Sequence, residues 1–213
     1  MSEEKLTVGE ISKPRFEFRT FGKDFFLQAG QMAKLSAPVP NHVKVRHSEE
    51  IYIISRTNNI NNTKIRTGKM DIKTYIQTID DLEQWNPLIK TEFPVSSELL
   101  KTNIFPAFQV SIPTFEQNEY AQDEFLSLIN NHQDLQAVDV VKERFGYMVH
   151  NTICEVANVV IDGKKSVTIN SESTEIEDIK KTLEDVGLGE LENINYLQAI
   201  KRIIGMINKP LAN

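Results

Sequence analysis

Charged and aromatic residues alternate in the stretch 15–19 (RFEFR) near the start of the chain. Because successive side chains of a β-strand point to opposite faces, Arg15, Glu17 and Arg19 would share one face of a strand. Arginine and lysine bind phosphate oxygens, and carboxylates placed among them can hold a divalent cation that bridges phosphates. The alternation therefore indicates a site for a phosphate-rich anion.

The same alternation recurs on four further segments, and each of them carries at least one lysine or arginine. Their charged residues are Lys64 and Arg66, Asp71 and Lys73, Lys90 and Glu92, and Lys142 and Arg144. On a single strand, a charged face usually means only that this face is in contact with water. The recurrence on five strands instead favours a sheet that closes on itself, with its charged faces directed toward one another.

The elements that would position these residues are short strands joined mostly by tight turns. Strands are predicted over 15–21, 50–56, 64–66, 70–76, 88–95, 137–148, 152–161 and 166–171. Thr67-Gly68-Lys69 and Asp162-Gly163 are typical of hairpin turns. Too few helices connect the strands for a parallel sheet, so we predict an α+β fold with an antiparallel sheet closed into a barrel.

Helices are predicted over 24–35, 96–105, 175–186 and 196–207, and a further one is expected to follow a capping box formed by Thr114 and Gln117. Ser96 is suited to cap the second of these helices, because its hydroxyl can accept a free backbone N–H. Gly187 and Gly189 would end the helix over 175–186.

The composition limits both the compartment and the partners. The 213 residues carry a net charge of −6 and one cysteine, Cys154, so no internal disulfide can form. An acidic molecule is no electrostatic binder of nucleic-acid duplexes, and any anion site must be a local cluster of cations. No apolar stretch is long enough to span a membrane. We expect a cytoplasmic protein with a mobile lead-in over 1–13 and a single domain over 14–213.

The order of these motifs resembles that of the CYTH-like superfamily, also called the triphosphate tunnel metalloenzymes. Its opening motif E-x-E-x-K is similar to the stretch 15–19, and its later strands resemble 64–66, 70–73, 82–94, 142–144, Glu155 and 170–172. The resemblance extends over residues 14–205. Three positions differ. Arg15 and Asn170 stand where the family has acidic residues, and each of these two differences removes a candidate metal ligand. Arg19 stands where the family has lysine, and its guanidinium group can still bind phosphate.

By this resemblance, the chain is expected to be an eight-stranded antiparallel barrel that acts on a triphosphate compound with Mg²⁺ or Mn²⁺. The resemblance implies Glu17 and Glu172 as catalytic residues, and Glu17, Glu155, Glu172 and Glu92 as metal ligands. The phosphate-binding residues that it implies are Arg19, Lys64, Arg66, Lys73, Lys90, Lys142 and Arg144.

The sequence leaves three functions open on this barrel. The first is metal-dependent hydrolysis of inorganic tripolyphosphate or of a nucleoside or thiamine triphosphate, and the second is nucleotidyl cyclisation of the adenylate-cyclase type. The third is a non-catalytic module that binds polyphosphate or nucleotide. The expected partner is a triphosphate-containing small molecule, with no nucleic-acid duplex and no membrane. The last helix, with Ile200 and Ile204, could either cover the barrel or pair with a second copy of the chain in a homodimer.

Overall fold

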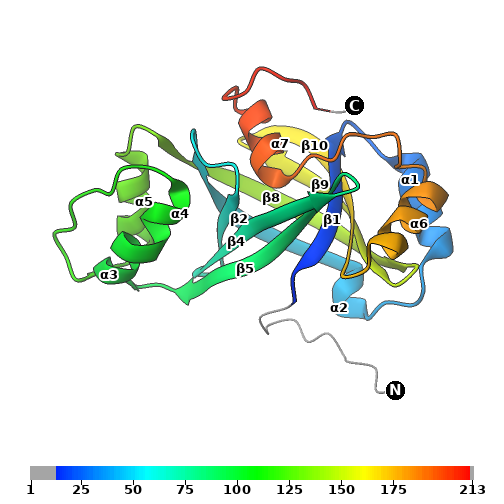
Figure 1. Cartoon of the computed structure of the whole chain (residues 1–213), viewed down its shortest axis with the longest axis horizontal. Coiled ribbons are helices and arrows are strands. Elements are labelled where there is room, and N and C mark those ends of the chain that lie inside the picture. Colours follow the sequence, from blue (N-terminus) through cyan, green and yellow to red (C-terminus); the bar gives the residue numbers. More distant parts are fainter. Residues whose placement is uncertain (1–12, 212–213) are drawn as a thin grey trace.

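Eight antiparallel strands close into a barrel in this computed structural model, which describes residues 13–211 (Figure 1). Around the barrel they follow the order β1-β10-β9-β8-β2-β3-β4-β5, and β5 pairs again with β1. Their bounds are β1 Arg15–Gly22, β2 Val45–Ser55, β3 Asn61–Arg66, β4 Lys69–Ile79, β5 Leu82–Glu92, β8 Leu135–Val149, β9 Thr152–Ile161 and β10 Lys164–Ser173. The predicted α+β fold with a closed antiparallel barrel is confirmed. The predicted lead-in lies outside the described residues as far as residue 12.

Two-residue turns in which both residues have positive φ connect consecutive strands. Thr67-Gly68 joins β3 to β4, and Asp162-Gly163 joins β9 to β10, as the sequence predicts. Asp80-Asp81 and His150-Asn151 form two further turns of this kind. Such turns match the right-handed twist of the flanking strands, so they hold neighbouring strands in register.

The apolar outer face of β1 and its neighbours is covered by helices α1 (Phe26–Leu35) and α6 (Ile176–Val186) (Figure 1). Phe16 and Phe18 of β1 pack with Ile179 and Leu183 of α6 in one buried cluster. Since Phe16 and Phe18 point outward, the charged residues between them must point into the barrel.

A helical lobe between β5 and β8 covers the outer face of β2, β3 and β4. It contains β6 (Val95–Ser96), α3 (Ser97–Leu99), the π-helical turn η1 (Leu100–Ile104), α4 (Phe105–Phe108), β7 (Glu119–Tyr120) and α5 (Gln122–Asn130). The Ser96 hydroxyl accepts the Leu99 N–H at 3.2 Å, as predicted. The capping box predicted at Thr114 is wrong, because α5 begins at Gln122, where the Glu124 carboxylate accepts the Ala121 N–H at 2.8 Å.

Helix α7 (Tyr196–Ile203) covers one end of the barrel (Figure 1). Its Leu197 and Ile200 are fully buried against inward-facing residues such as Val138 and Ala157. The helix ends before the predicted residue 207, and Gly205 then adopts a positive φ of 81°. Within residues 13–211, no helix combines the length and the apolar character needed to cross a membrane.

We expect the change Gly146→Ala to destabilise the fold. Gly146 lies on β8 beneath the short helix α2 (Asn41–Lys44), and a Cβ there would stand 2.6 Å from the carbonyl oxygen of Val43. Because that neighbour is backbone, the free energy of unfolding should fall by about 1–3 kcal/mol. Chemical denaturation measures this loss. The control Gly30→Ala, at a helical position with nothing within 4 Å of an added Cβ, should not destabilise, and an equal loss in both variants would contradict the explanation.

Candidate functional site

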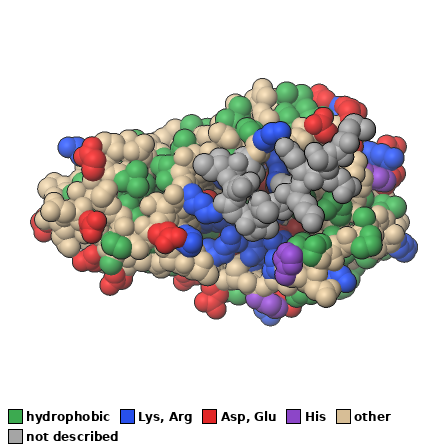
Figure 2. Space-filling view, turned by 90° about the horizontal axis from the view of Figure 1, so that it is seen from below, with side chains coloured by type: hydrophobic (Ala, Val, Ile, Leu, Met, Phe, Trp, Pro, Cys, Tyr) green, Lys and Arg blue, Asp and Glu red, His purple; other side chains and the backbone are tan. Residues whose placement is uncertain are grey.

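The inner face of the barrel is charged in the part that lies away from α7. Side chains of directly paired strand residues point to the same side, and Lys64 lies opposite Asp71, which in turn lies opposite Lys90. The side chain of Lys142 is 3% exposed, whereas that of Arg66 is 40% exposed. On the face of the molecule opposite α7, lysine and arginine side chains gather near the middle (Figure 2). The charged part of the interior is therefore most buried on its side nearer α7 and more exposed toward the opposite end.

One buried carboxylate, that of Glu50 on β2, lies at the centre of this interior. Its side chain is fully buried, and Lys142 Nζ lies 2.8 Å away. Arg66, Arg144 and Lys64 follow with nitrogen–oxygen distances of 3.4, 3.6 and 3.9 Å. Burial by itself would raise the pKa of this carboxyl, but Lys64, Lys142 and Arg144 outweigh burial and hold the pKa far below its usual range. Glu50 is thus ionised, and its negative charge stabilises the four neighbouring cations.

The three inner carboxylates on β1, β9 and β10 are each paired with an arginine. Arg19 Nε lies 2.6 Å from Glu17 Oε1, and Arg46 lies 2.7 Å from Glu155. Arg15 lies 3.7 Å from Glu172. Burial opposes the charge on Glu17, yet Arg19 and Lys73 lower the pKa of this carboxyl. The Glu17 carboxylate is therefore held in the charged form.

The deep end of the interior combines a lysine with two tyrosines. Lys142 Nζ donates to the hydroxyl of Tyr52 at 2.8 Å and lies 3.7 Å from the centre of the Tyr196 ring. Burial lowers the pKa of Lys142, and the charge of the adjacent Glu50 carboxylate opposes that shift. The stacked rings of Tyr52 and Tyr196 separate the charged part of the interior from the apolar part under α7.

Glu83 on β5 differs from the other inner carboxylates in its hydrogen bonds. It lies opposite Glu17, which lies opposite Glu172 on the other side of β1. Its oxygens accept from two neutral donors, Asn195 Nδ2 at 3.0 Å and Trp85 Nε1 at 3.2 Å. Burial raises the pKa of Glu83, and the neighbouring Glu17 charge acts in the same direction. Three carboxylates from adjacent strands therefore form one row across the inner face.

The structure places most of the predicted site residues on this inner face. They are Glu17, Arg19, Lys64, Arg66, Lys73, Lys142, Arg144, Glu155 and Glu172. Lys90 shares the side of Asp71 but is exposed. Glu92 stands apart from the other acids, at the last residue of β5, where its side chain is 69% exposed and lies 2.6 Å from Lys69.

Sequence reasoning missed the charged alternation on β2 because it started this strand too late. The strand begins at Val45 rather than residue 50, so Arg46, Ser48, Glu50 and Tyr52 alternate on one face. A strand prediction that began five residues earlier would have shown the same charged alternation as on β1. Glu83 was missed because β5 begins at Leu82 rather than at the predicted residue 88. Tyr196 had no such signal, because a helix far along the chain carries it into the site.

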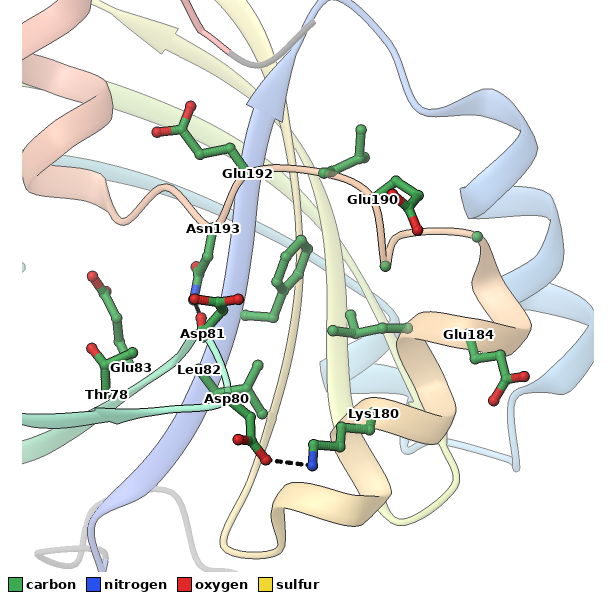
Figure 3. Close-up of a pocket in the computed structure, with 15 residues that line it drawn as sticks. Thr78, Asp80, Asp81, Leu82, Glu83, Lys180, Glu184, Glu190, Glu192 and Asn193 are labelled. Carbon is green, nitrogen blue, oxygen red and sulfur yellow. Dashed lines mark hydrogen bonds and ion pairs between the residues drawn. The ribbon is translucent and has the colours of Figure 1, made fainter.

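A hollow on the outer surface has the opposite character (Figure 3). It lies between α6 and the turn from β4 to β5, and acidic residues such as Asp80, Asp81, Glu184 and Glu190 line it. Lys180 contributes a cation but is paired with Asp80. A phosphate-rich anion would be repelled there, so the barrel interior is the better candidate.

No protein-family model and no curated protein matches the chain, but solved structures of similar shape exist. An adenylate cyclase candidate from Bacillus halodurans aligns with a TM-score of 0.49 at 11% identity, over 88% of this chain and 98% of its own. A Hippeastrum protein with dominant triphosphatase activity gives 0.46 at 11%, over 91% and 97%. The PH1012 protein from Pyrococcus horikoshii gives 0.46 at 16%, over 86% and 99%.

The barrel is the fold that the resemblance to the CYTH-like superfamily implies. The sequence identities to these structures are only 11–16%. The chemistry of the interior therefore depends on the residues of this chain and does not follow from the fold.

We expect Glu50→Gln to be strongly destabilising, because it leaves four cations close together without their shared counter-charge. Removing one partner of a buried ionic cluster costs about 3–5 kcal/mol. Urea denaturation at neutral pH measures the loss. The control Glu49→Gln changes the exposed neighbouring carboxylate on the outer face of β2, and it should alter stability by less than about 0.5 kcal/mol. Similar stabilities for both variants would show that Glu50 does not hold the cluster together.

Proposed function

We propose that the barrel interior binds the triphosphate group of a small molecule and hydrolyses it with the help of a divalent metal ion. The observation that carries this proposal is the excess of positive charge around Glu50, where four cations share one buried carboxylate. Such a cluster is costly unless an anion joins it. A triphosphate, with several charged oxygens in a row, has the chemistry to do so.

Unused hydrogen-bond donors in the same place support this ligand. Among the described residues, the buried Nε–H groups of Arg46 and Arg144 have no hydrogen-bond partner. Ser48 accepts from another nitrogen of Arg144 at 2.6 Å and so holds that guanidinium in place. Guanidinium groups match the oxygens of phosphate in geometry as well as in charge. Each arginine is thus held by a hydrogen bond from one guanidinium nitrogen, and its Nε–H group is left to donate to a ligand.

The inner oxygens also fit a magnesium or manganese ion. Glu17 lies opposite Glu172, and Asn170 lies between Arg19 and Glu155 with its buried Oδ1 lacking a hydrogen-bond partner in the described structure. Hard divalent cations prefer oxygen ligands, and Mg²⁺ usually takes one or two carboxylates together with phosphate oxygens. No group of three or more Asp, Glu, His or Cys side chains within residues 13–211 is placed to hold a metal by itself, so substrate oxygens would complete the site.

In this proposal Glu17 and Glu172 hold the metal, with Glu155 and Asn170 beside them. When bound, the metal would neutralise charge on the phosphates and orient a water molecule for in-line attack. Lys64, Arg66 and Arg144 would bind the phosphoryl oxygens, and Glu50 would keep these cations directed at one point. Phosphoryl transfer needs mainly such positioning and charge stabilisation. The exposed Glu92, which is paired with Lys69, would contribute little.

A non-catalytic binding module is a second candidate, and one observation favours it. Glu17, Glu155 and Glu172 are each already paired with an arginine, so a metal would have to compete for them. The interior would then bind the anion through its cations alone.

Turnover assays distinguish the two candidates. The protein is incubated with tripolyphosphate or ATP and with Mg²⁺ or Mn²⁺, and released phosphate and cyclic nucleotide are measured. Hydrolysis predicts metal-dependent phosphate release that Glu172→Gln lowers by about 100-fold. The control Glu143→Gln, on the outer face of β8, should retain the rate. Metal-independent binding without turnover would reject the hydrolase and favour the binding module.

Affinity for tripolyphosphate, measured without metal, tests the lysine and arginine residues of the site separately from its carboxylates. Arg144→Gln should weaken metal-free binding by about tenfold, because a charged group loses its hydrogen bonds to the phosphates. Isothermal titration calorimetry measures the dissociation constant. Arg56→Gln, which changes an exposed arginine just beyond β2, is the matched control and should bind as the wild type does. Equal affinities for all three proteins would place the anion site elsewhere.

A further inference from the structure

Helix α7 places the side chain of Tyr196 at the boundary between the apolar and the charged parts of the barrel interior. The residues just before it are fixed to the barrel: the Ile194 N–H donates to the carbonyl oxygen of Arg19 at 2.5 Å, and Asn195 donates to Glu83. The Asn195 side chain also accepts the Gln198 N–H at 3.0 Å and so caps α7. Tyr196 is therefore held in a defined position although no strand carries it.

Aromatic and cationic groups surround the Tyr196 ring. It stacks on Tyr52 with 5.2 Å between the ring centres and meets the edge of Phe21 at 5.0 Å. The Lys142 ammonium lies 3.7 Å and the Arg19 guanidinium 4.8 Å from the ring centre. Cations over an aromatic face are attracted to it, so the ring belongs to the charged site as well as to the apolar core.

The hydroxyl of Tyr196 is an unused donor at the bottom of the charged interior. The residue is only 7% exposed, and its hydroxyl has no hydrogen-bond partner among the described residues. Burial raises the pKa of Tyr196 well above its ordinary value, so the hydroxyl keeps its proton and can donate. The Arg19 guanidinium and the Lys142 ammonium over the ring place Tyr196 among the residues of the proposed site.

Beyond Tyr196 the barrel is filled with apolar side chains. Val138, Ala157, Ile161 and Leu197 are all buried there in one cluster under α7. A phosphate group cannot be accommodated among them, because a buried charge requires paired or hydrogen-bonding partners. An anion that enters from the exposed charged end must therefore stop at Tyr196.

We propose that the Tyr196 hydroxyl donates a hydrogen bond to the innermost phosphoryl group, and that α7 thereby restricts the site to the free end of a phosphate chain. This inference rests on the proposed function and adds a substrate-binding residue that lies outside the charged strands. It also assigns specificity, since a cyclic phosphate has no chain end to reach Tyr196.

Tyr196→Phe tests the inference, because it keeps the ring contacts and removes only the hydroxyl. We expect metal-free affinity for linear tripolyphosphate to fall by about tenfold, with the thermal unfolding midpoint retained. Tyr147→Phe, at a partly buried tyrosine of β8 in the cluster beneath α1 and α6, is the matched control and should bind as the wild type does.

Cyclic trimetaphosphate provides the second measurement. The wild type should bind it at least about tenfold more weakly than linear tripolyphosphate, and Tyr196→Phe should reduce this preference. Equal affinities of wild type and Tyr196→Phe for linear tripolyphosphate would overturn the role of Tyr196 and leave the proposed function standing. A wild type that binds no tripolyphosphate at all would reject the proposed function together with this inference.

Discussion

The arrangement of the barrel interior depends on the ionic cluster around Glu50. A fully buried carboxylate is unfavourable by itself, and so are four cations within a few ångströms of one another. Together they compensate in part, and the excess of positive charge remains available to an anion. Cations from β3 and β8 meet at this one side chain of β2, so the cluster also links strands that are far apart in the sequence.

Closure of the sheet makes this cluster possible. In an open sheet, the charged faces would contact water and the side chains would spread apart. The helices α1 and α6 and the lobe between β5 and β8 cover the apolar outer faces, which leaves the charged faces to line the interior. Helix α7 then divides that interior, since its Leu197 and Ile200 fill one end with apolar side chains and Tyr196 lies at the boundary.

The seam between β1 and β5 shows how loops contribute to the site. These strands pair only from Arg15 to Glu17, and beyond this point the side chain of Asn193 accepts the Arg19 N–H and donates to the carbonyl oxygens of Glu17 and Asp81. The segment before α7 therefore bonds to β1 beyond the first residues of β5, where the pairing of the two strands ends. Hydrogen bonds from this segment therefore help to position Glu17 and Arg19, in addition to the pairing of their own strand.

The sequence alone predicted most of the strands, though not where β2 and β5 begin, and which of their side chains share a face, because a period of two follows from backbone geometry. It thereby predicted the charged residues of β1, β3 and β8 and the closed antiparallel barrel. Only the tertiary structure decided that Glu50 is their shared counter-charge, that Glu83 stands in a row with Glu17 and Glu172, and that Glu92 lies apart. The same is true of Tyr196, which a helix near the end of the chain brings to the deep end of the site. Such neighbours depend on how strands tilt and close and on where α7 docks, and no local periodicity carries that information.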